Sequence, residues 1–310
     1  MAEFSHIPVL LNETIDLLDI KPNGIYFDGT LGGAGHSKKI EQTQKISRLI
    51  GVDQDSEALD FAKKNLAEFD NVTYVHDNFR NIDKILDDLN IDKVDGILID
   101  IGVSSYQIDT AERGFSFRYD AKLDMRMNRE SDFSAYNVVN EYDEEDLFRI
   151  LKDYGEEKFA RSIARHIVRE REKAPIETTK KLEDIVLGSV PRYRGQNGMS
   201  NIQRTFQAIR IEVNHELDSL SEFIDKAVSR LKSGGRLAVI TFHSLEDRIV
   251  KQKFKELSTG CICPPGLLYC VCGHKPVVNL ITKHPVTASD EELEKNSRSS
   301  SAKLRVVEKI

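Results

Sequence analysis

A glycine-rich stretch near the N-terminus is the clearest candidate for ligand binding. Residues 25–37 read IYFDGTLGGAGHS and open with a short apolar run that predicts a buried strand. The turn that follows carries four glycines in seven residues: Gly29, Gly32, Gly33 and Gly35. Glycines let the backbone turn sharply and let a ligand approach the main chain closely. A strand, such a turn and then a helix predict a nucleotide or nucleoside cradle, and the alternative is a turn that binds no ligand.

The acid before these glycines narrows the kind of ligand. Asp28 stands at the end of the predicted strand, so the spacing differs from the G-x-G-x-x-G dinucleotide fingerprint. No Lys-Ser or Lys-Thr pair follows, which excludes a P-loop. An acid at the strand end suits a ligand with a cationic amine better than one that binds through a pyrophosphate.

The elements that must position this turn form a repeating pattern. Apolar runs that read as strands alternate with helical segments, which predicts a parallel sheet covered on both faces. The runs cover residues 25–28, 48–53, 72–77 and 94–101. An aspartate lies at the carboxyl end of each run: Asp28, Asp53, Asp77 and Asp100. Ligands of such sheets bind at the carboxyl ends of the strands, so we expect these acids to line one site.

Two of these strand ends predict an adenosine ligand. Asp53 ends the second strand, where an acid accepts hydrogen bonds from both ribose hydroxyls. Residues 77–79, Asp-Asn-Phe, follow the third strand and offer a polar contact and an aromatic wall to an adenine.

The alternation breaks in the middle of the chain. Residues 102–234 separate the fourth strand from the next clear one at 235–243, and a single crossover helix needs far fewer. We therefore predict an inserted, mainly helical domain at 106–215 and a catalytic domain formed by 1–105 with 216–310. Residues 277–282 and 303–308 predict a late antiparallel hairpin at the sheet edge.

Charge is distributed unevenly along the chain. The net charge of −7 argues against nucleic-acid binding by the whole surface. Between Ile185 and Ile211, however, there are four arginines and no acid, and Arg192 and Arg194 flank a tyrosine in a glycine-containing loop. This composition suits phosphate contacts with base stacking. A basic stripe on the predicted helix 156–173 is more typical of a solvated face.

All four cysteines lie close together in the sequence: Cys261, Cys263, Cys270 and Cys272. In a cytosolic chain such clustering favours zinc or another thiophilic metal over disulfides. The two C-x-C pairs depart from the usual zinc spacing, and reduced structural cysteines are the alternative. We expect a cytoplasmic protein, because no apolar run approaches the roughly 18 residues of a membrane span and the first residues lack signal-peptide features.

Together the acids, the turn and the late hairpin resemble the class I S-adenosylmethionine-dependent methyltransferases. Longer motifs narrow the resemblance to the ribosomal RNA small subunit methyltransferase H family, also called MraW. They are FDGTLGGAGH at 27–36, DIGVSS at 100–105, RGFSF at 113–117, LDMRM at 123–127, TFHSLED at 241–247 and SAKLR at 301–305.

The resemblance implies a Rossmann-like α/β fold with an inserted helical subdomain that recognises RNA. It implies methyl transfer from S-adenosylmethionine to N4 of a cytidine in the 16S rRNA of the small ribosomal subunit, near the P site. The cofactor residues that it implies are Gly32, Gly33, Ala34, Gly35, His36, Asp53, Phe79, Asp100 and Gln107.

The candidate catalytic residue is Asp100. Amino methyltransferases often place Asp/Asn-Pro-Pro-aromatic after the fourth strand, and here the acid is kept without the prolines or the aromatic ring. Asp100 can contact the cofactor, accept a hydrogen bond from the cytosine amine, or do both. Phe115 and Phe117 can stack on a splayed-out base or pack in a core, and neither role is favoured.

Three other functions compete with methyl transfer. An NAD-dependent oxidoreductase fits the acid after the second strand, but not the glycine spacing. A non-catalytic RNA-binding protein would keep the cradle as a relict. A hydrolase built on His243, Ser244, Glu246 and Asp247 lacks a G-x-S-x-G elbow.

Overall fold

The protein divides into two compact units. The structure is a computed structural model that describes residues 8–191, 198–261, 263, 269 and 271–310. One unit comprises Met1–Gly102 with Leu217–Ile310, and the other comprises Val103–Glu216. The boundaries predicted from the sequence lay at 105/106 and 215/216. We call the first unit the sheet unit and the second the helical unit.

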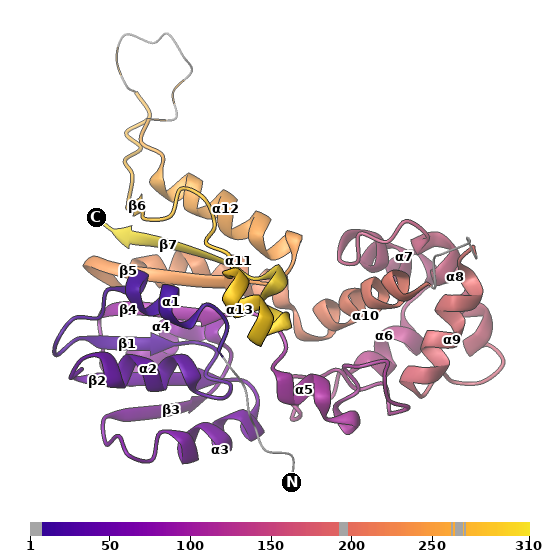
Figure 1. Cartoon of the computed structure of the whole chain (residues 1–310). Helices are drawn as coiled ribbons and strands as arrows, with labels where there is room; N and C mark the ends of the chain where they lie inside the picture. The colour runs from indigo at the N-terminus through magenta and orange to yellow at the C-terminus, as the bar shows by residue number, and fades with distance from the viewer. Residues whose placement is uncertain (1–7, 192–197, 262, 264–268, 270) are drawn as a thin grey trace. The chain divides into compact units, whose positions relative to one another are not determined.

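A seven-stranded sheet forms the centre of the sheet unit (Figure 1). Its order is β3-β2-β1-β4-β5-β7-β6. The strands are β1 (Ile25–Asp28), β2 (Arg48–Asp53), β3 (Val72–His76), β4 (Val94–Asp100), β5 (Leu231–Thr241), β6 (Val278–Leu280) and β7 (Lys303–Lys309). The first five strands pair in parallel, and β7 runs antiparallel to both β5 and β6. The predicted mostly parallel sheet with a late antiparallel hairpin is therefore confirmed.

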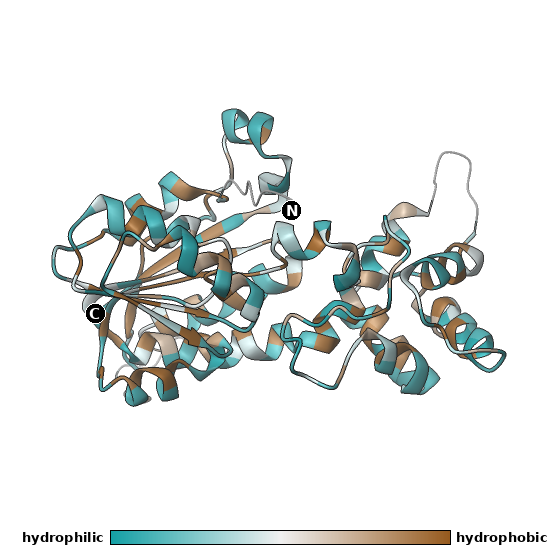
Figure 2. Cartoon of the chain, turned by 90° about the horizontal axis from the view of Figure 1, so that it is seen from below, coloured by the Kyte–Doolittle hydropathy of each residue, from teal (hydrophilic) through white to brown (hydrophobic). Residues whose placement is uncertain are grey.

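Helices cover both faces of this sheet. One face packs against α1 (Leu11–Leu18), α2 (Gly35–Thr43) and α3 (Ser56–Asn65). The other packs against α4 (Ile82–Asp88), α11 (Glu216–Ser229) and α12 (Ser244–Ser258). Successive strand residues point to opposite faces, so Tyr26 enters one core and Phe27 the other. Burial on both faces is why the strands are continuous apolar runs, as the colouring of Figure 2 shows.

The start of β5 differs from the sequence prediction. The sequence predicted a strand at 235–243, but β5 begins at Leu231 and includes residues 232–235. Val94 pairs with Leu231 and Gly96 pairs with Arg236, so the register shifts between the two pairs. Gly234, with φ +77°, lets the intervening residues bulge while the pairing continues on either side.

The helical unit has a core of its own. Its helices are α5 (Ser105–Asp109), α6 (Ala135–Glu141), α7 (Glu144–Asp153), α8 (Ala160–Arg171), α9 (Thr179–Ser189) and α10 (Met199–Asn214). Apolar residues from α6 to α10 form one buried cluster, which includes Leu147, Ile163 and Phe206. One short helix, α13 (Asp290–Lys295), belongs to the sheet unit. In the part of the chain that the structure describes, no helix is both long and apolar enough to cross a membrane.

The basic stripe on α8 is largely neutralised within the helical unit. Arg161 pairs with Glu145 and also lies over the Phe148 ring, 3.8 Å from its centroid. Arg165 lies 3.8 Å from Glu144, at the start of α7. These intramolecular pairs favour the solvated-face interpretation of the stripe.

Candidate cofactor site and active site

The carboxyl ends of β2, β1 and β4 bring three aspartates to one edge of the sheet. These strands are neighbours and run in parallel, and Asp28 lies in register with Gly51 on one side and Leu98 on the other. Asp53 and Asp100 end the two flanking strands. The clustering predicted from the sequence therefore holds for Asp28, Asp53 and Asp100.

Asp28 joins the end of β1 to the start of α2. It is almost fully buried, and its Oδ2 accepts a 2.7 Å hydrogen bond from the Ser37 hydroxyl. Its Oδ1 accepts a 3.1 Å bond from the Thr30 amide. Burial, which disfavours the charged form, raises the pKa of Asp28 to about 6.

Asp53 joins the end of β2 to the glycine turn. Its Oδ2 accepts a 2.8 Å hydrogen bond from the Gly32 amide, and its Oδ1 accepts a 2.9 Å bond from the Asp55 amide. Burial raises the pKa of Asp53 to about 6. Each carboxylate oxygen keeps a second lone pair, so both can also accept a ribose hydroxyl.

Backbone geometry explains the composition of the turn itself. Gly32 has φ +46° and Ala34, the residue before α2, has φ +60°. A side chain on Gly35 would place its Cβ 2.2 Å from Cγ of Pro8, so only glycine fits next to Pro8. The Asn65 side chain donates a 2.9 Å hydrogen bond to the Gly33 carbonyl, a contact that the sequence did not predict.

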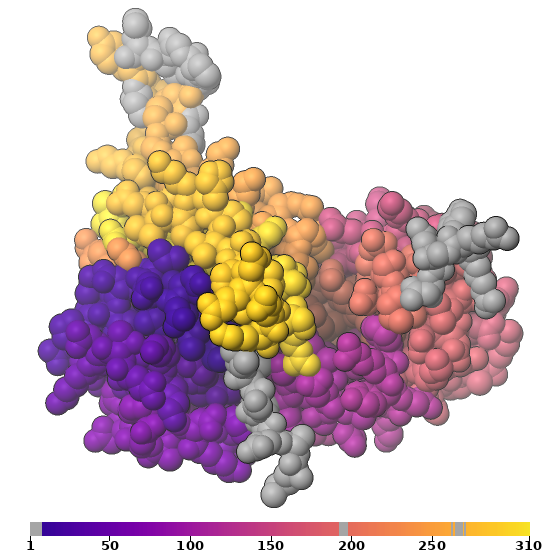
Figure 3. Space-filling model, in the orientation of Figure 1, coloured from indigo at the N-terminus to yellow at the C-terminus, as the bar shows by residue number. Residues whose placement is uncertain are grey.

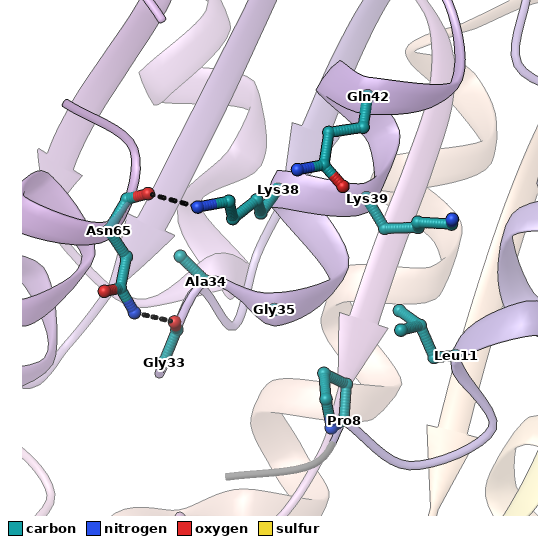
Figure 4. Close-up of a pocket in the computed structure, with 9 residues that line it drawn as sticks. All are labelled: Pro8, Leu11, Gly33, Ala34, Gly35, Lys38, Lys39, Gln42 and Asn65. Atoms are coloured by element: carbon teal, nitrogen blue, oxygen red, sulfur yellow. Dashed lines mark hydrogen bonds between the residues drawn. The ribbon is translucent and has the colours of Figure 1, made fainter. Parts of the chain in front are cut away.

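A cavity of about 250 Å³ borders the same turn (Figure 4). Its lining residues are Pro8, Leu11, Gly33, Ala34, Gly35, Lys38, Lys39, Gln42 and Asn65. None of the three aspartates is among them. The cavity therefore borders the glycine turn but not the aspartate edge.

Asp100, at the end of β4, is the most perturbed of the three acids. Its Oδ1 is buried and has no hydrogen-bond partner among the described residues. Its backbone amide donates a 2.6 Å hydrogen bond to Oγ1 of Thr30. Burial, followed by repulsion from Asp28 and Glu246, raises the pKa of Asp100 to about 8.

His36 lies between the N-terminal segment and Asp100. Its Nε2 is 3.0 Å from the Val9 carbonyl oxygen, which can only accept, so Nε2 carries a hydrogen. Its Nδ1 lies 3.9 Å from Oδ2 of Asp100. The carboxyl and the imidazole therefore face each other within the reach of electrostatic interaction.

Glu246, on the first turn of α12, is a further acid near Asp100, which we had named only for the hydrolase alternative. It is fully buried, and its Oε2 accepts hydrogen bonds from the amides of Phe242 (2.8 Å) and His243 (3.2 Å). Its Oε1 lies 2.9 Å from Nε2 of His243. The TFHSLED motif at the end of β5 was the sequence signal that pointed to this group.

The charge of the aspartate edge fits S-adenosylmethionine. No lysine or arginine in the described part of the chain forms an ion pair with Asp28, Asp53 or Asp100, and burial raises the pKa of each. A cationic ligand would favour their charged forms. S-adenosylmethionine carries a sulfonium and an ammonium group, and the orphaned Oδ1 of Asp100 offers an acceptor.

Two other predicted cofactor residues have structural contacts. Phe79 opens a short 3₁₀ helix (Phe79–Asn81) and packs edge-on against Phe223, with ring centroids 5.1 Å apart. Gln107 belongs to the helical unit, where it forms a reciprocal capping box with Ser104 at the start of α5. Their roles toward the cofactor stay predictions.

The predicted RNA residues divide into described and undescribed ones. Phe115 and Phe117 are half-buried against the core of the helical unit, and Phe117 packs edge-on against Phe206 at 5.6 Å. Packing is thus one role of both rings, and base stacking stays a prediction. Arg192, Arg194 and the predicted metal ligand Cys270 lie outside the described residues.

The strand order, the antiparallel β7 and the glycine turn after β1 define the fold of class I S-adenosylmethionine-dependent methyltransferases. The sequence profile of the MraW methylase family matches residues 3–310, and the chain belongs to that family. Membership of a methylase family argues against the oxidoreductase and hydrolase alternatives.

Curated relatives match over their full length. The ribosomal RNA small subunit methyltransferase H of Clostridium botulinum (strain Loch Maree) is 60% identical over 309 residues, covering 99% of this chain and 100% of the relative. The protein of the same name from Lachnospira eligens is 54% identical over 312 residues, covering 100% of this chain and 99% of the relative. Among solved structures, a putative methyltransferase from Streptococcus mutans in complex with SAH is 12% identical, with a TM-score of 0.46, covering 98% of this chain and 100% of that one.

Proposed function

We propose that this protein transfers a methyl group from S-adenosylmethionine to the exocyclic N4 of a cytidine in 16S rRNA, near the P site of the small ribosomal subunit. Methylation of small-subunit rRNA is what the names of its full-length relatives state for those proteins. The choice of atom and base is what the resemblance to the methyltransferase H family implies, and the chemistry of the aspartate edge supports it.

The observation that carries the proposal is the unpartnered Oδ1 of Asp100 at the end of β4. The cytosine amine is a poor nucleophile, because its lone pair is delocalised into the ring. An acceptor for one amine hydrogen lets the nitrogen pyramidalise and lose a proton as the new bond forms. A buried carboxyl with a free oxygen can serve as that acceptor.

The cofactor is assigned to the glycine turn and the neighbouring strand ends. Residues Gly32–His36 would hold its methionine part, Asp53 its ribose and Phe79 a face of its adenine. When bound, the cofactor supplies an electrophilic methyl group. The chain contributes its fixed backbone turn, which sets the position of the reacting atoms before the amine arrives.

Asp100 and His36 provide a place for the amine proton. The pKa of Asp100 is raised to about 8 while no cation is present, and binding of a cationic cofactor favours its charged form. The charged carboxylate can then accept a hydrogen bond from the cytosine amine. The facing Nδ1 of His36 is positioned to stabilise a proton on this pair.

RNA recognition is assigned to the helical unit. Arg192 and Arg194 would contact phosphates, because the segment around them is rich in arginine and contains no acid. Phe115 or Phe117 would stack on the target base, since an enzyme that modifies a base must take it out of its stack.

The test uses small ribosomal subunits from cells that lack the gene. The purified protein is incubated with these subunits and with S-adenosylmethionine that carries a deuterated methyl group, and the rRNA is digested to nucleosides for mass spectrometry. We expect labelled N4-methylcytidine. A label on cytosine C5, on a ribose oxygen or on another base contradicts the proposed atom, and no label on subunits or naked 16S rRNA contradicts the activity.

A further inference from the structure

The segment between α12 and β6 holds every cysteine of the chain and takes no part in the proposed methyl transfer. It leaves α12 after Ser258 and returns at Val278, and its described residues stand out from the surface of the sheet unit (Figures 1 and 3). We call residues 260–274 the cysteine loop. Two of its apolar side chains, Tyr269 and Val271, are about four-fifths exposed, at 81% and 78%. The described part of the loop therefore has no hydrophobic cluster to hold it.

The base of the cysteine loop is closed by hydrogen bonds. Nδ1 of His274 lies 2.7 Å from the Gly260 carbonyl oxygen, so this ring nitrogen carries the hydrogen. Just outside, the Val277 amide donates a 2.9 Å bond to the Leu257 carbonyl. These hydrogen bonds hold the two arms of the loop side by side, next to Cys261 on one arm and Cys272 on the other.

Three thiol groups converge directly inside this base. The Sγ atoms of Cys261, Cys263 and Cys272 all lie within 4.8 Å of one another. The Cys261 and Cys272 sulfurs are 3.9 Å apart. Sulfurs that share a tetrahedral zinc ion at Zn–S distances of about 2.3 Å are separated by about 3.8 Å, whereas a disulfide requires about 2.05 Å. The separation matches two ligands of one metal ion.

Backbone amides are directed at two of these sulfurs. The Cys263 amide donates to Sγ of Cys261 at 3.4 Å, and the Val271 amide donates to Sγ of Cys263 at 3.3 Å. Amide donors stabilise a thiolate more than a thiol, because they favour the charged form. The thiolate is also the form that binds metals.

We propose that Cys261, Cys263 and Cys272 bind a thiophilic divalent cation, with Zn²⁺ as the ion that best fits a set of thiolates, and that this ion joins the two arms that carry these cysteines. Metal binding would contribute folding free energy to the described part of the loop, where Tyr269 and Val271 are exposed. The three thiolates leave one position of a tetrahedral ion for a further ligand. We assign the site a structural role, because it lies on a segment that the proposed methyl-transfer chemistry does not use. The C-x-C spacing is shorter than the C-x₂₋₄-C spacing of common zinc motifs. Here the third sulfur comes from the opposite arm of the loop, so a longer spacing within one arm is not needed.

The first experiment measures metal in the full-length protein, purified without chelator and after removal of any affinity tag. Elemental mass spectrometry should find about one zinc ion per chain. Replacing zinc with Co²⁺ should produce thiolate-to-cobalt charge-transfer bands and the strong visible bands of tetrahedral cobalt. Zinc below about a tenth of the chain concentration in zinc-supplied protein, together with no cobalt spectrum, overturns the proposal.

Two variants distinguish loss of the metal ligands from the effect of any other substitution in the cysteine loop. Cys261→Ser with Cys272→Ser should lose the bound metal and the cobalt spectrum. Tyr269→Ser changes an exposed residue of the same loop without touching a sulfur, so it should keep both. Retention of full metal content by the double serine variant contradicts the assigned ligands.

A third measurement uses the unaltered protein, in case the double variant folds poorly. Thiol-specific reagents should react slowly with the native protein and rapidly once a strong chelator has removed the metal. Cys270 is not an assigned ligand, so one thiol per chain can react rapidly without chelator. Rapid reaction of three or more thiols without chelator shows that the assigned ligands are free, and a mass lower by two hydrogens shows a disulfide. Either result contradicts the metal site.

Discussion

The Gly32 amide donates a 2.8 Å hydrogen bond to Oδ2 of Asp53, and this bond joins the glycine turn after β1 to the carboxyl end of β2. Gly32 lies in the turn that follows β1 and Asp53 ends the neighbouring strand β2, and each was selected from the sequence for a different part of the same ligand. Their contact means that the proposed methionine and ribose positions form one connected surface. Removing either partner should disturb both.

Asp53→Ala should therefore weaken cofactor binding by at least about tenfold, which corresponds to about 1.4 kcal/mol. The change removes the ribose acceptor and leaves the Gly32 and Asp55 amides without their partner. Isothermal titration calorimetry with S-adenosylmethionine or its demethylated product measures the effect. Asp55→Ala is the matched control, because Asp55 caps α3 and should cost about 1 kcal/mol of stability with little loss of affinity. Affinity of Asp53→Ala within twofold of the unaltered protein would contradict the ribose assignment.

Asp100→Asn should lower both cofactor affinity and kcat. The amide keeps the shape of the side chain but cannot carry negative charge, so we expect about a tenfold loss of affinity and a further loss of about 10²- to 10⁴-fold in kcat. Single-turnover methylation of small subunits at saturating cofactor separates the two effects. An unchanged single-turnover rate would leave Asp100 with a cofactor role alone, and unchanged affinity would leave it with a role toward the amine alone.

Cofactor affinity should rise with pH between about 6 and about 7.5. Burial raises the pKa of Asp28 and Asp53 to about 6 and that of Asp100 to about 8, so the empty site holds protons that a cationic ligand must displace. Each released proton adds up to about tenfold in affinity per pH unit. Calorimetry of cofactor binding in buffers of different ionisation enthalpy counts the released protons, and the count should be lower in Asp100→Asn. The same raised pKa values should make the empty protein less stable as pH rises from about 4 to about 8, since the folded state then binds more protons than the unfolded state. Binding without proton release would show that the acids do not face the ligand.

Gly35→Ala should destabilise the sheet unit by about 1–3 kcal/mol, because the new Cβ would lie 2.2 Å from the Pro8 ring. The N-terminal segment would have to move away from the turn, which should also weaken cofactor binding. Gly188→Ala is the matched control, since Gly188 lies in α9 and has no atom within 4 Å of an added Cβ. It should stabilise its helix by up to about 1 kcal/mol. Thermal unfolding with and without cofactor compares the two, and equal stability of Gly35→Ala and the unaltered protein would contradict the close packing of Pro8.

Arg192→Ala with Arg194→Ala should reduce methylation of small subunits without changing cofactor affinity. Loss of two phosphate contacts should also lower the slope of log affinity against log salt by about 2. Arg161→Ala with Arg165→Ala provides the control, because these arginines already pair with Glu145 and Glu144 on α7. If both double variants behave alike, the segment 191–198 is not the RNA surface.

The positions of the strands and their terminal acids followed from the sequence alone. Buried parallel strands are continuous apolar runs, so β1 and β2 were predicted with the bounds that the structure shows. An acid where such a run ends lies at the ligand-binding edge of the sheet, which is why the sequence alone predicted the positions of Asp28, Asp53 and Asp100 at that edge. The glycine turn could be recognised because its backbone needs positive φ at Gly32 and close packing at Gly35.

Other features depended on contacts between residues far apart in the chain, which local patterns do not encode. Asn65 holds the turn from the end of α3, and the buried Glu246 raises the pKa of Asp100 from the start of α12. Phe79 was selected as an adenine wall, yet its ring also packs on Phe223, more than a hundred positions later. The spacing of the cysteines argued against the common zinc motifs, and only the pairing of the two loop arms brought three sulfurs together. Sequence periodicity determined which residues reach the sheet edge, whereas tertiary packing decided which of them touch and how their charges interact.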